Sequence, residues 1–193
     1  MSGNAAAATA IHREVLASAR VAGADRVVAE ALTGLVFDLE FEGAGVEAEA
    51  VADEAVAAAA GGSPLLRAGA LHARAVVDWR RGQPGQARVG FEAALAVYRD
   101  RGDRRQEAAL VGMLGNLYLD DGLVVEARRA YDQALEAHRA LGSRRLEGLV
   151  VGNLGTLDEA VGDLAHALQR QHAALAIHRE IGDQRLVAHH ATN

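Results

Sequence analysis

Few side chains in this 193-residue sequence are spaced for catalysis or metal binding. Eight histidines are present, but no pair has the HExxH spacing of a zinc enzyme. The paired acids Asp120-Asp121 and Asp158-Glu159 lack a visible partner group for acid–base work, and no phosphate-binding glycine motif or nucleophile elbow occurs. Without cysteine, thiolate sites and disulfides are excluded. We therefore expect no enzyme activity, no cofactor and no metal.

Composition favours a helical, cytoplasmic protein. Alanine accounts for 43 residues, proline for 2, and all 20 basic residues are arginine, which suggests a GC-rich bacterial genome. The net charge of −6 argues against a nucleic-acid partner. No signal or membrane segment is visible, because the most apolar stretch, residues 51–60, is short and carries two acids. We expect neither a membrane nor a nucleic-acid partner.

The sequence contains a 40-residue repeat, and this repeat predicts the helices that position its side chains. Without gaps, residues 104–143 match residues 144–183 at 15 of 40 positions and match residues 64–103 at 8. Such self-similarity at a fixed period is typical of stacked helical repeats. The shared small residues include Gly82, Gly122, Gly162, Gly102, Gly142, Gly182, Ala87, Ala127, Ala167, Ala94, Ala134 and Ala174.

Each repeat predicts two antiparallel helices of about 17 residues, a first and a second helix. Asp103 and Ser143 are suitable N-caps of first helices, and Gln106 completes a capping box with Asp103. Pro84 and Asp163 suit the starts of second helices, and the recurring glycines suit the ends. The prediction is one solenoid over residues 1–193, with a leading helix (5–20), a divergent repeat (23–62), three repeats (64–103, 104–143, 144–183) and a partial repeat or cap (184–193).

These residues resemble the tetratricopeptide repeat, and the length resembles the long variety of kinesin light chains, cell-polarity adaptors and bacterial regulators. The best match is Leu114-Gly115-Asn116-Leu117-Tyr118 with Gly122, Ala127, Tyr131 and Ala134. In the next repeat Leu154-Gly155, Gly162, Ala167 and Ala174 fit, but Asp158 and Gln171 replace the aromatic residues. The resemblance implies an all-α, right-handed α-solenoid of stacked antiparallel helix hairpins, with the first helices on the concave side.

The resemblance also implies that a peptide or helix of a partner protein binds in the concave groove, on first-helix positions. Carried over by register, these positions are Glu30, Thr33, Phe37, Glu40, Phe41, His72, Val76, Trp79, Arg80, Gly112, Asn116, Leu119, Asp120, Gly152, Asn153, Thr156 and Glu159.

Several of these positions keep two interpretations. The amide of Asn116 could hold a partner's backbone or bond a neighbouring helix. Gly112 and Gly152 could lower the groove floor or serve tight packing, and packing is the favoured interpretation. Trp79 could be an exposed anchor or core under the turn at Gly82, and Phe37 and Phe41 pose the same choice.

Charge and histidines add further expectations. Residues 1–61 carry 10 acidic and 3 basic side chains, which indicates a solvated acidic face or a docking patch for a basic segment. His138 and His178 occupy equivalent second-helix positions and are expected to face solvent. Four other histidines are ordinary surface residues or, less favoured, an incidental metal site: His166, His172, His189 and His190.

Three functions follow in order of preference. The first is a non-catalytic protein–protein interaction module. The second is a regulatory or sensory segment of a larger bacterial signalling protein, or a homodimer formed through an open solenoid end. The last is an enzyme.

Overall fold

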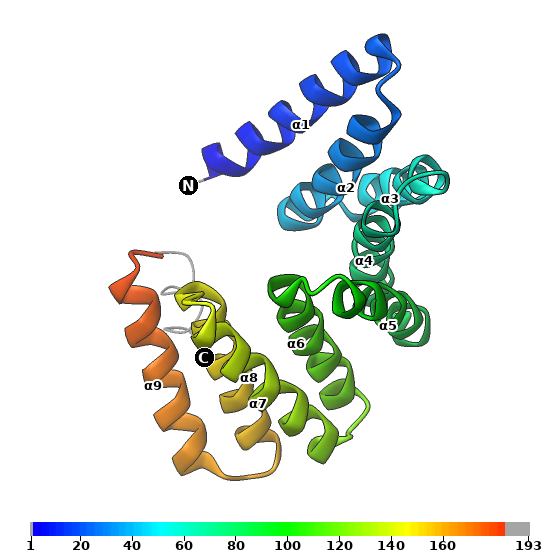
Figure 1. Cartoon of the computed structure of the whole chain (residues 1–193). Coiled ribbons are helices and arrows are strands. Elements are labelled where there is room, and N and C mark those ends of the chain that lie inside the picture. The colour runs from blue at the N-terminus through cyan, green and yellow to red at the C-terminus, as the bar shows by residue number, and fades with distance from the viewer. Residues whose placement is uncertain (1, 184–193) are drawn as a thin grey trace. The chain divides into compact units, whose positions relative to one another are not determined.

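The computed structural model describes residues 2–183, which form nine helices and no strand. It divides the chain into two compact units, unit 1 (residues 1–102) and unit 2 (residues 103–193). Unit 1 contains α1 (Ser2–Ala22), α2 (Asp25–Glu42), α3 (Gly45–Ala59), α4 (Pro64–Arg80) and α5 (Pro84–Asp100). Unit 2 contains α6 (Arg104–Asp120), α7 (Val124–Ala140), α8 (Arg144–Ala160) and α9 (Leu164–Glu180) (Figure 1).

Within each unit, consecutive helices pack as antiparallel hairpins joined by two to four residues (Figure 1). The first helices are α2 and α4 in unit 1 and α6 and α8 in unit 2. The glycines predicted to end helices do so: Gly82, for example, has a φ of 74°, a left-handed conformation that costs glycine little. Pro84 stands in the first turn of α5 as expected.

The side-chain caps predicted at Asp103 and Asp163 form, and the one predicted at Ser143 does not. The side chain of Asp103 accepts a hydrogen bond from the backbone N–H of Gln106 at 3.1 Å, and that of Asp163 accepts one from His166 at 3.3 Å. Ser143 precedes α8 but makes no side-chain capping bond, so its predicted cap is wrong. The first turn of α8 is tied instead by the Arg144–Glu147 pair, which joins Nη1 and Oε2 at 2.7 Å.

The core of unit 1 is built from alanine and leucine. Fully buried alanines of α3, such as Ala48 and Ala52, face buried Leu32 and Val36 of α2. Such small side chains let helix axes approach closely, while leucine fills the remaining space. α1 adds Leu16 to this core and lies against α2. It starts three residues earlier than predicted, at Ser2.

In unit 2, glycines let aromatic rings pack directly on first helices. A Cβ added at Gly115 of α6 would lie 2.7 Å from a ring carbon of Tyr131, and one at Gly148 of α8 would lie 2.5 Å from the ring of His178. His138 and His178 are 1% and 0% exposed, so the prediction that they face solvent is wrong. These two histidine side chains point from their second helices toward a first helix rather than toward solvent.

An ion-pair cluster replaces the missing aromatic residues of the last repeat. Asp158 of α8 is buried, and its two carboxylate oxygens lie 2.6 Å from Nη2 of Arg128 on α7 and 2.7 Å from Nε of Arg170 on α9. A buried carboxylate is tolerated when cations surround it in this way. The departure from the repeat pattern therefore links three helices of unit 2.

None of the helices formed by residues 2–183 is long and apolar enough to cross a membrane. The partial repeat predicted at residues 184–193 lies outside the described residues, and the single solenoid over the whole chain stays a prediction.

Candidate functional site

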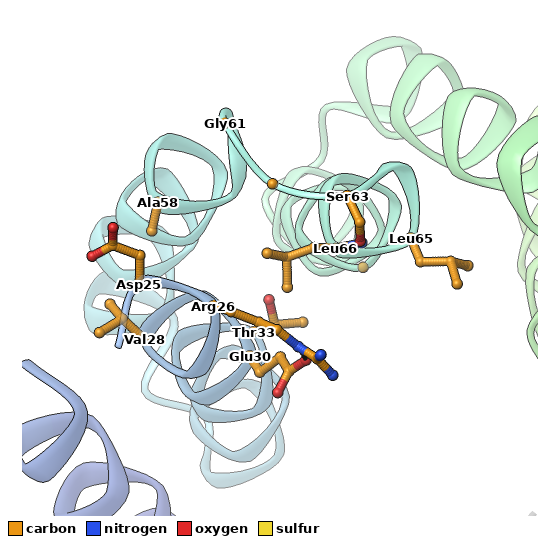
Figure 2. A pocket seen from close by; sticks show the side chains of 12 residues that line it. Asp25, Arg26, Val28, Glu30, Thr33, Ala58, Gly61, Ser63, Leu65 and Leu66 are labelled. Carbon is orange, nitrogen blue, oxygen red and sulfur yellow. Dashed lines mark hydrogen bonds and ion pairs between the residues drawn. The ribbon is translucent and has the colours of Figure 1, made fainter. Parts of the chain in front are cut away.

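A hollow of unit 1 lies between the first halves of α2 and α4. It is an open cavity of about 960 Å³, with the end of α3 and the α3–α4 connection at its side. Figure 2 shows Thr33 of α2 and Leu66 of α4 facing the space between the two helices. The lining residues are Asp25, Arg26, Val28, Glu30, Thr33, Ala58, Gly61, Gly62, Ser63, Leu65, Leu66 and Gly69.

Local sequence explains why the cavity is there. α3 has 15 residues, whereas α5, α7 and α9 have 17, so the connection through Gly61 and Gly62 is longer. Gly69 faces the cavity without a side chain, and an added Cβ would still lie 3.8 Å from Thr33 Cγ2. The repeat-equivalent residue of α8 is Leu149. The absence of a side chain at Gly69 therefore leaves the space between α2 and α4 open.

The cavity has an apolar wall and a charged rim. Val28, Ala58 and Leu66 supply the apolar surface. At the rim, Arg26 Nε donates to Glu30 Oε1 at 2.8 Å, and the Arg26 side chain is 82% exposed. An exposed pair of this kind is easily rearranged by a ligand, because it contributes little to stability. The cavity can therefore accept an apolar side chain while its rim offers both signs of charge.

Beyond the cavity, side chains join α2 to α4. The His72 ring lies edge-on between Phe37 and Phe91, with ring centroids 5.2 and 5.9 Å away. His72 is 7% exposed, and burial lowers its pKa to about 4. Glu40 and Arg80 come together at 3.9 Å, and burial raises the pKa of Glu40 even though Arg80 opposes the shift.

Unit 2 joins its first helices through amides. The Tyr131 hydroxyl donates to Asn116 Oδ1 at 2.7 Å, and Asn153 Nδ2 donates to the same oxygen at 2.9 Å. Burial and the carboxylate of Asp120 raise the pKa of Tyr131, so the phenol stays protonated as a donor. The structure thus brings two predicted residues, Asn116 and Asn153, together across α6 and α8.

The predicted groove residues divide by location. Glu30 and Thr33 line the cavity, whereas His72 and Val76 are buried and present little open surface. Phe37, Glu40, Trp79, Asn116, Leu119 and Asn153 are half-buried; Gly112 and Gly152 are buried; Phe41, Arg80, Asp120, Thr156 and Glu159 are exposed. Their partner-binding role stays a prediction.

The acidic run of unit 1 is engaged by other side chains of the same unit. Four of its acids contact α1, two contact α4, and one contacts Arg81, which directly follows α4. The pairs are Asp38 with His12, Glu42 with Thr9, Glu47 with Arg13, Glu54 with Arg20, Asp53 with Arg74, Glu49 with Arg81 and Glu40 with Arg80. Sequence reasoning missed these pairs because a charge count does not show which helix faces meet.

Comparison with known proteins places this fold. No protein-family model and no curated protein matches the sequence. Among solved structures, BtubC from P. vanneervenii aligns with a TM-score of 0.71 and 22% identity over 91% of this chain and 74% of that one. A kinesin-light-chain protein of Podosopora anserina with nearly identical TPR-like repeats aligns with a TM-score of 0.64 and 17% identity over 94% and 90%. This chain has a TPR-like fold.

Aspartyl phosphate phosphatase F from Bacillus subtilis aligns with a TM-score of 0.72 and 10% identity over 84% of this chain, but the match spans only 43% of the phosphatase. At these identities the likeness concerns the fold alone. It confirms the predicted all-α, TPR-like class of stacked helix hairpins and leaves the partner to be inferred from the surface.

Proposed function

We propose that the chain is a non-catalytic interaction module that binds a peptide or helix of a partner protein on first-helix surfaces. The observation that carries this proposal is the cavity between α2 and α4. Two residues assigned to the groove from the sequence, Glu30 and Thr33, line it. Its apolar wall and mixed-charge rim suit a protein segment that carries an apolar side chain flanked by polar groups.

Two other predicted features, Asn116 of unit 2 and the acidic run of unit 1, contribute less to partner binding in this proposal. The Asn116 oxygen already accepts two hydrogen bonds, which favours the inter-helix interpretation over a backbone clamp. The acids of residues 38–54 likewise have internal partners, so a basic segment gains less there than the charge count suggests. The cytoplasmic location, the bacterial source, the homodimer and the role in a larger signalling protein stay predictions.

The cavity can be narrowed by one substitution. Gly69→Leu places in α4 the side chain that α8 carries at the equivalent position, so the helix should tolerate it. Peptides selected from a random display library on the unmodified chain should bind Gly69→Leu at least about tenfold more weakly, because the leucine occupies the part of the cavity next to Thr33. Fluorescence anisotropy with labelled peptides measures this difference.

A matched control is Gly85→Leu in α5, where an added Cβ meets nothing within 4 Å. This variant should bind the selected peptides as the unmodified chain does. Peptides that bind Gly69→Leu and the unmodified chain equally would show that the cavity is not the binding site.

A further inference from the structure

A line of apolar side chains is exposed on one side of α9. We call this surface the α9 face; its side chains within α9 follow each other at three- and four-residue steps and so share one side of the helix, and Val161 precedes them at the end of α8. Leu164 and Leu168 are 67% and 60% exposed, and Val161 is 49% exposed. Contiguous exposed apolar side chains mark interaction surfaces in many proteins. The α9 face consists of Val161, Leu164, Leu168, His172, Leu175 and Arg179.

The repeat shows what covers the equivalent face of α7. In the preceding repeat, α8 packs on this face of α7. Arg128 Nη2 of α7 donates to Asp158 Oδ1 of α8 at 2.6 Å, and Arg139 Nε of α7 donates to Glu147 Oε1 of α8 at 3.0 Å. Leu135, between these two arginines, is 8% exposed. Residues 128, 135 and 139 correspond to residues 168, 175 and 179 of α9, so an antiparallel helix is the natural cover for the α9 face.

The two faces differ in a way that specifies the chemistry of the cover. α7 has an arginine at 128, which meets a carboxylate, whereas α9 has Leu168 at that place and requires an apolar group. Arg179 corresponds to Arg139, but within residues 2–183 Arg179 has no ion pair. The cover should therefore carry an apolar residue over Leu168 and a carboxylate in its first turn over Arg179.

Residues 184–193 and a second copy are both poor sources of the carboxylate over Arg179. Residues 184–193 contain no acid, and the register places Val187 where α8 has Glu147. In an α9-to-α9 pair, Arg179 would have to draw Asp163 or Glu180 away from the cations that these acids already contact, His166 and Arg144. The charge of Arg179 thus favours a different protein.

We propose that the α9 face docks an amphipathic helix of a partner protein, antiparallel to α9, in the place that α8 takes on α7. This goes beyond the proposed function: the α9 face belongs to unit 2 and the cavity to unit 1, so the two proposals can fail separately.

The probe is a synthetic peptide of residues 143–161 with Asp158→Leu, because α8 is the helix that fits the equivalent face. It should bind the intact chain at least about tenfold more tightly than the unchanged peptide, whose Asp158 would be buried against Leu168. Isothermal titration calorimetry measures both. Leu168→Glu in the chain should weaken the binding of the substituted peptide at least about tenfold.

A charge exchange tests the predicted orientation. Arg179→Glu should weaken binding of the substituted peptide, and a peptide that also carries Glu147→Arg should restore it, since the pair is then reversed. The control is Val125→Glu on α7, where the valine is 59% exposed and lies outside the α9 face. This variant should bind normally.

Three results would overturn the proposal. The first is equal peptide binding by Leu168→Glu and the unmodified chain. The second is no binding at the highest soluble peptide concentration. The third is a concentration-dependent dimer, seen by sedimentation, that Leu168→Glu abolishes, because a second copy would then be the cover.

Discussion

The two units fold the same repeat pattern but treat the space between their first helices differently. In unit 1, α2 and α4 leave a cavity of about 960 Å³ where they begin. Farther along these helices, Phe37 of α2 meets the ring of His72 of α4, whereas in unit 2 Asn153 of α8 donates a hydrogen bond to Asn116 of α6. The difference lies at positions outside the pattern, such as Gly69 against Leu149. The small-residue pattern sets the packing of the backbones, and the variable positions decide whether a surface is open.

The sole tryptophan makes this comparison measurable. Trp79 lies in α4, so its fluorescence reports on unit 1, whereas far-UV circular dichroism reports on all helices. A substitution that acts on one unit can therefore be assigned to it. If the two signals always change together, the units unfold as one and the comparison concerns surfaces only.

The largest expected effect is on pH dependence, through His72. Burial lowers the pKa of His72 to about 4, against about 6.5 in an unfolded chain. The unfolded chain therefore binds more protons between these values, so the free energy of unfolding falls as the pH falls from 6.5 toward 4. The full loss is about 3 kcal/mol. Urea unfolding followed by Trp79 fluorescence at several pH values measures it.

His72→Leu is the matched variant for this prediction. Nε2 of His72 has no hydrogen-bond partner within the described residues, so leucine sacrifices no bond and still fills the space between Phe37 and Phe91. The variant should lose most of the acid sensitivity of the fluorescence signal. His138 and His178 of unit 2, whose pKa values are also lowered by burial, should keep part of it in circular dichroism.

The second prediction concerns the packing of unit 2. Gly115→Ala would place a methyl group 2.7 and 2.8 Å from two ring carbons of Tyr131, which is 1% exposed. We expect a loss of about 2 kcal/mol in the free energy of unfolding, because the buried ring has little room to move. Circular dichroism should show the loss. Gly69→Ala in unit 1 is the control, and a similar loss there would contradict the explanation.

The third prediction separates the two roles of Asn116. Asn116→Ala removes the acceptor of the Tyr131 hydroxyl and of the Asn153 amide, and should cost about 1–2 kcal/mol of stability. A double-mutant cycle with Tyr131→Phe should show coupling, because both substitutions remove the same bond. Unchanged stability together with weaker peptide binding would instead favour the backbone-clamp interpretation.

Sequence and structure agree best where the repeat pattern is strong. The helix ends at Gly82 and the cap at Asp103 could be predicted, because they depend on neighbours in the chain. The pairing of Arg13 with Glu47 and the burial of His178 could not, because they depend on which helix faces another. A histidine has a polar edge and an aromatic body, and a single sequence does not say which of them meets the core.

The candidate site shows the same division. The resemblance pointed to Glu30 and Thr33, and both line the cavity. It did not point to Gly61, Gly62 or Gly69, although the short α3 and the absent side chain of Gly69 create the space. A deletion in a helix and a missing side chain are weak signals, because they depart from the pattern rather than match it.

The smallest expected effect tests the two interpretations of Gly112. A Cβ added there would lie 3.7 Å from the Cβ of Ala134 and 3.9 Å from Val150 Cγ2, which are ordinary contact distances. Gly112→Ala should therefore stabilise the chain by about 0.5–1 kcal/mol, since alanine suits a helix interior better than glycine. A measured loss would mean that tight packing requires the glycine. A gain in stability accompanied by weaker peptide binding would mean that the glycine lowers the groove floor, and a gain with unchanged binding would exclude both roles. Because Gly115→Ala, one turn along the same helix, should act in the opposite direction, the two variants together separate packing from helix propensity.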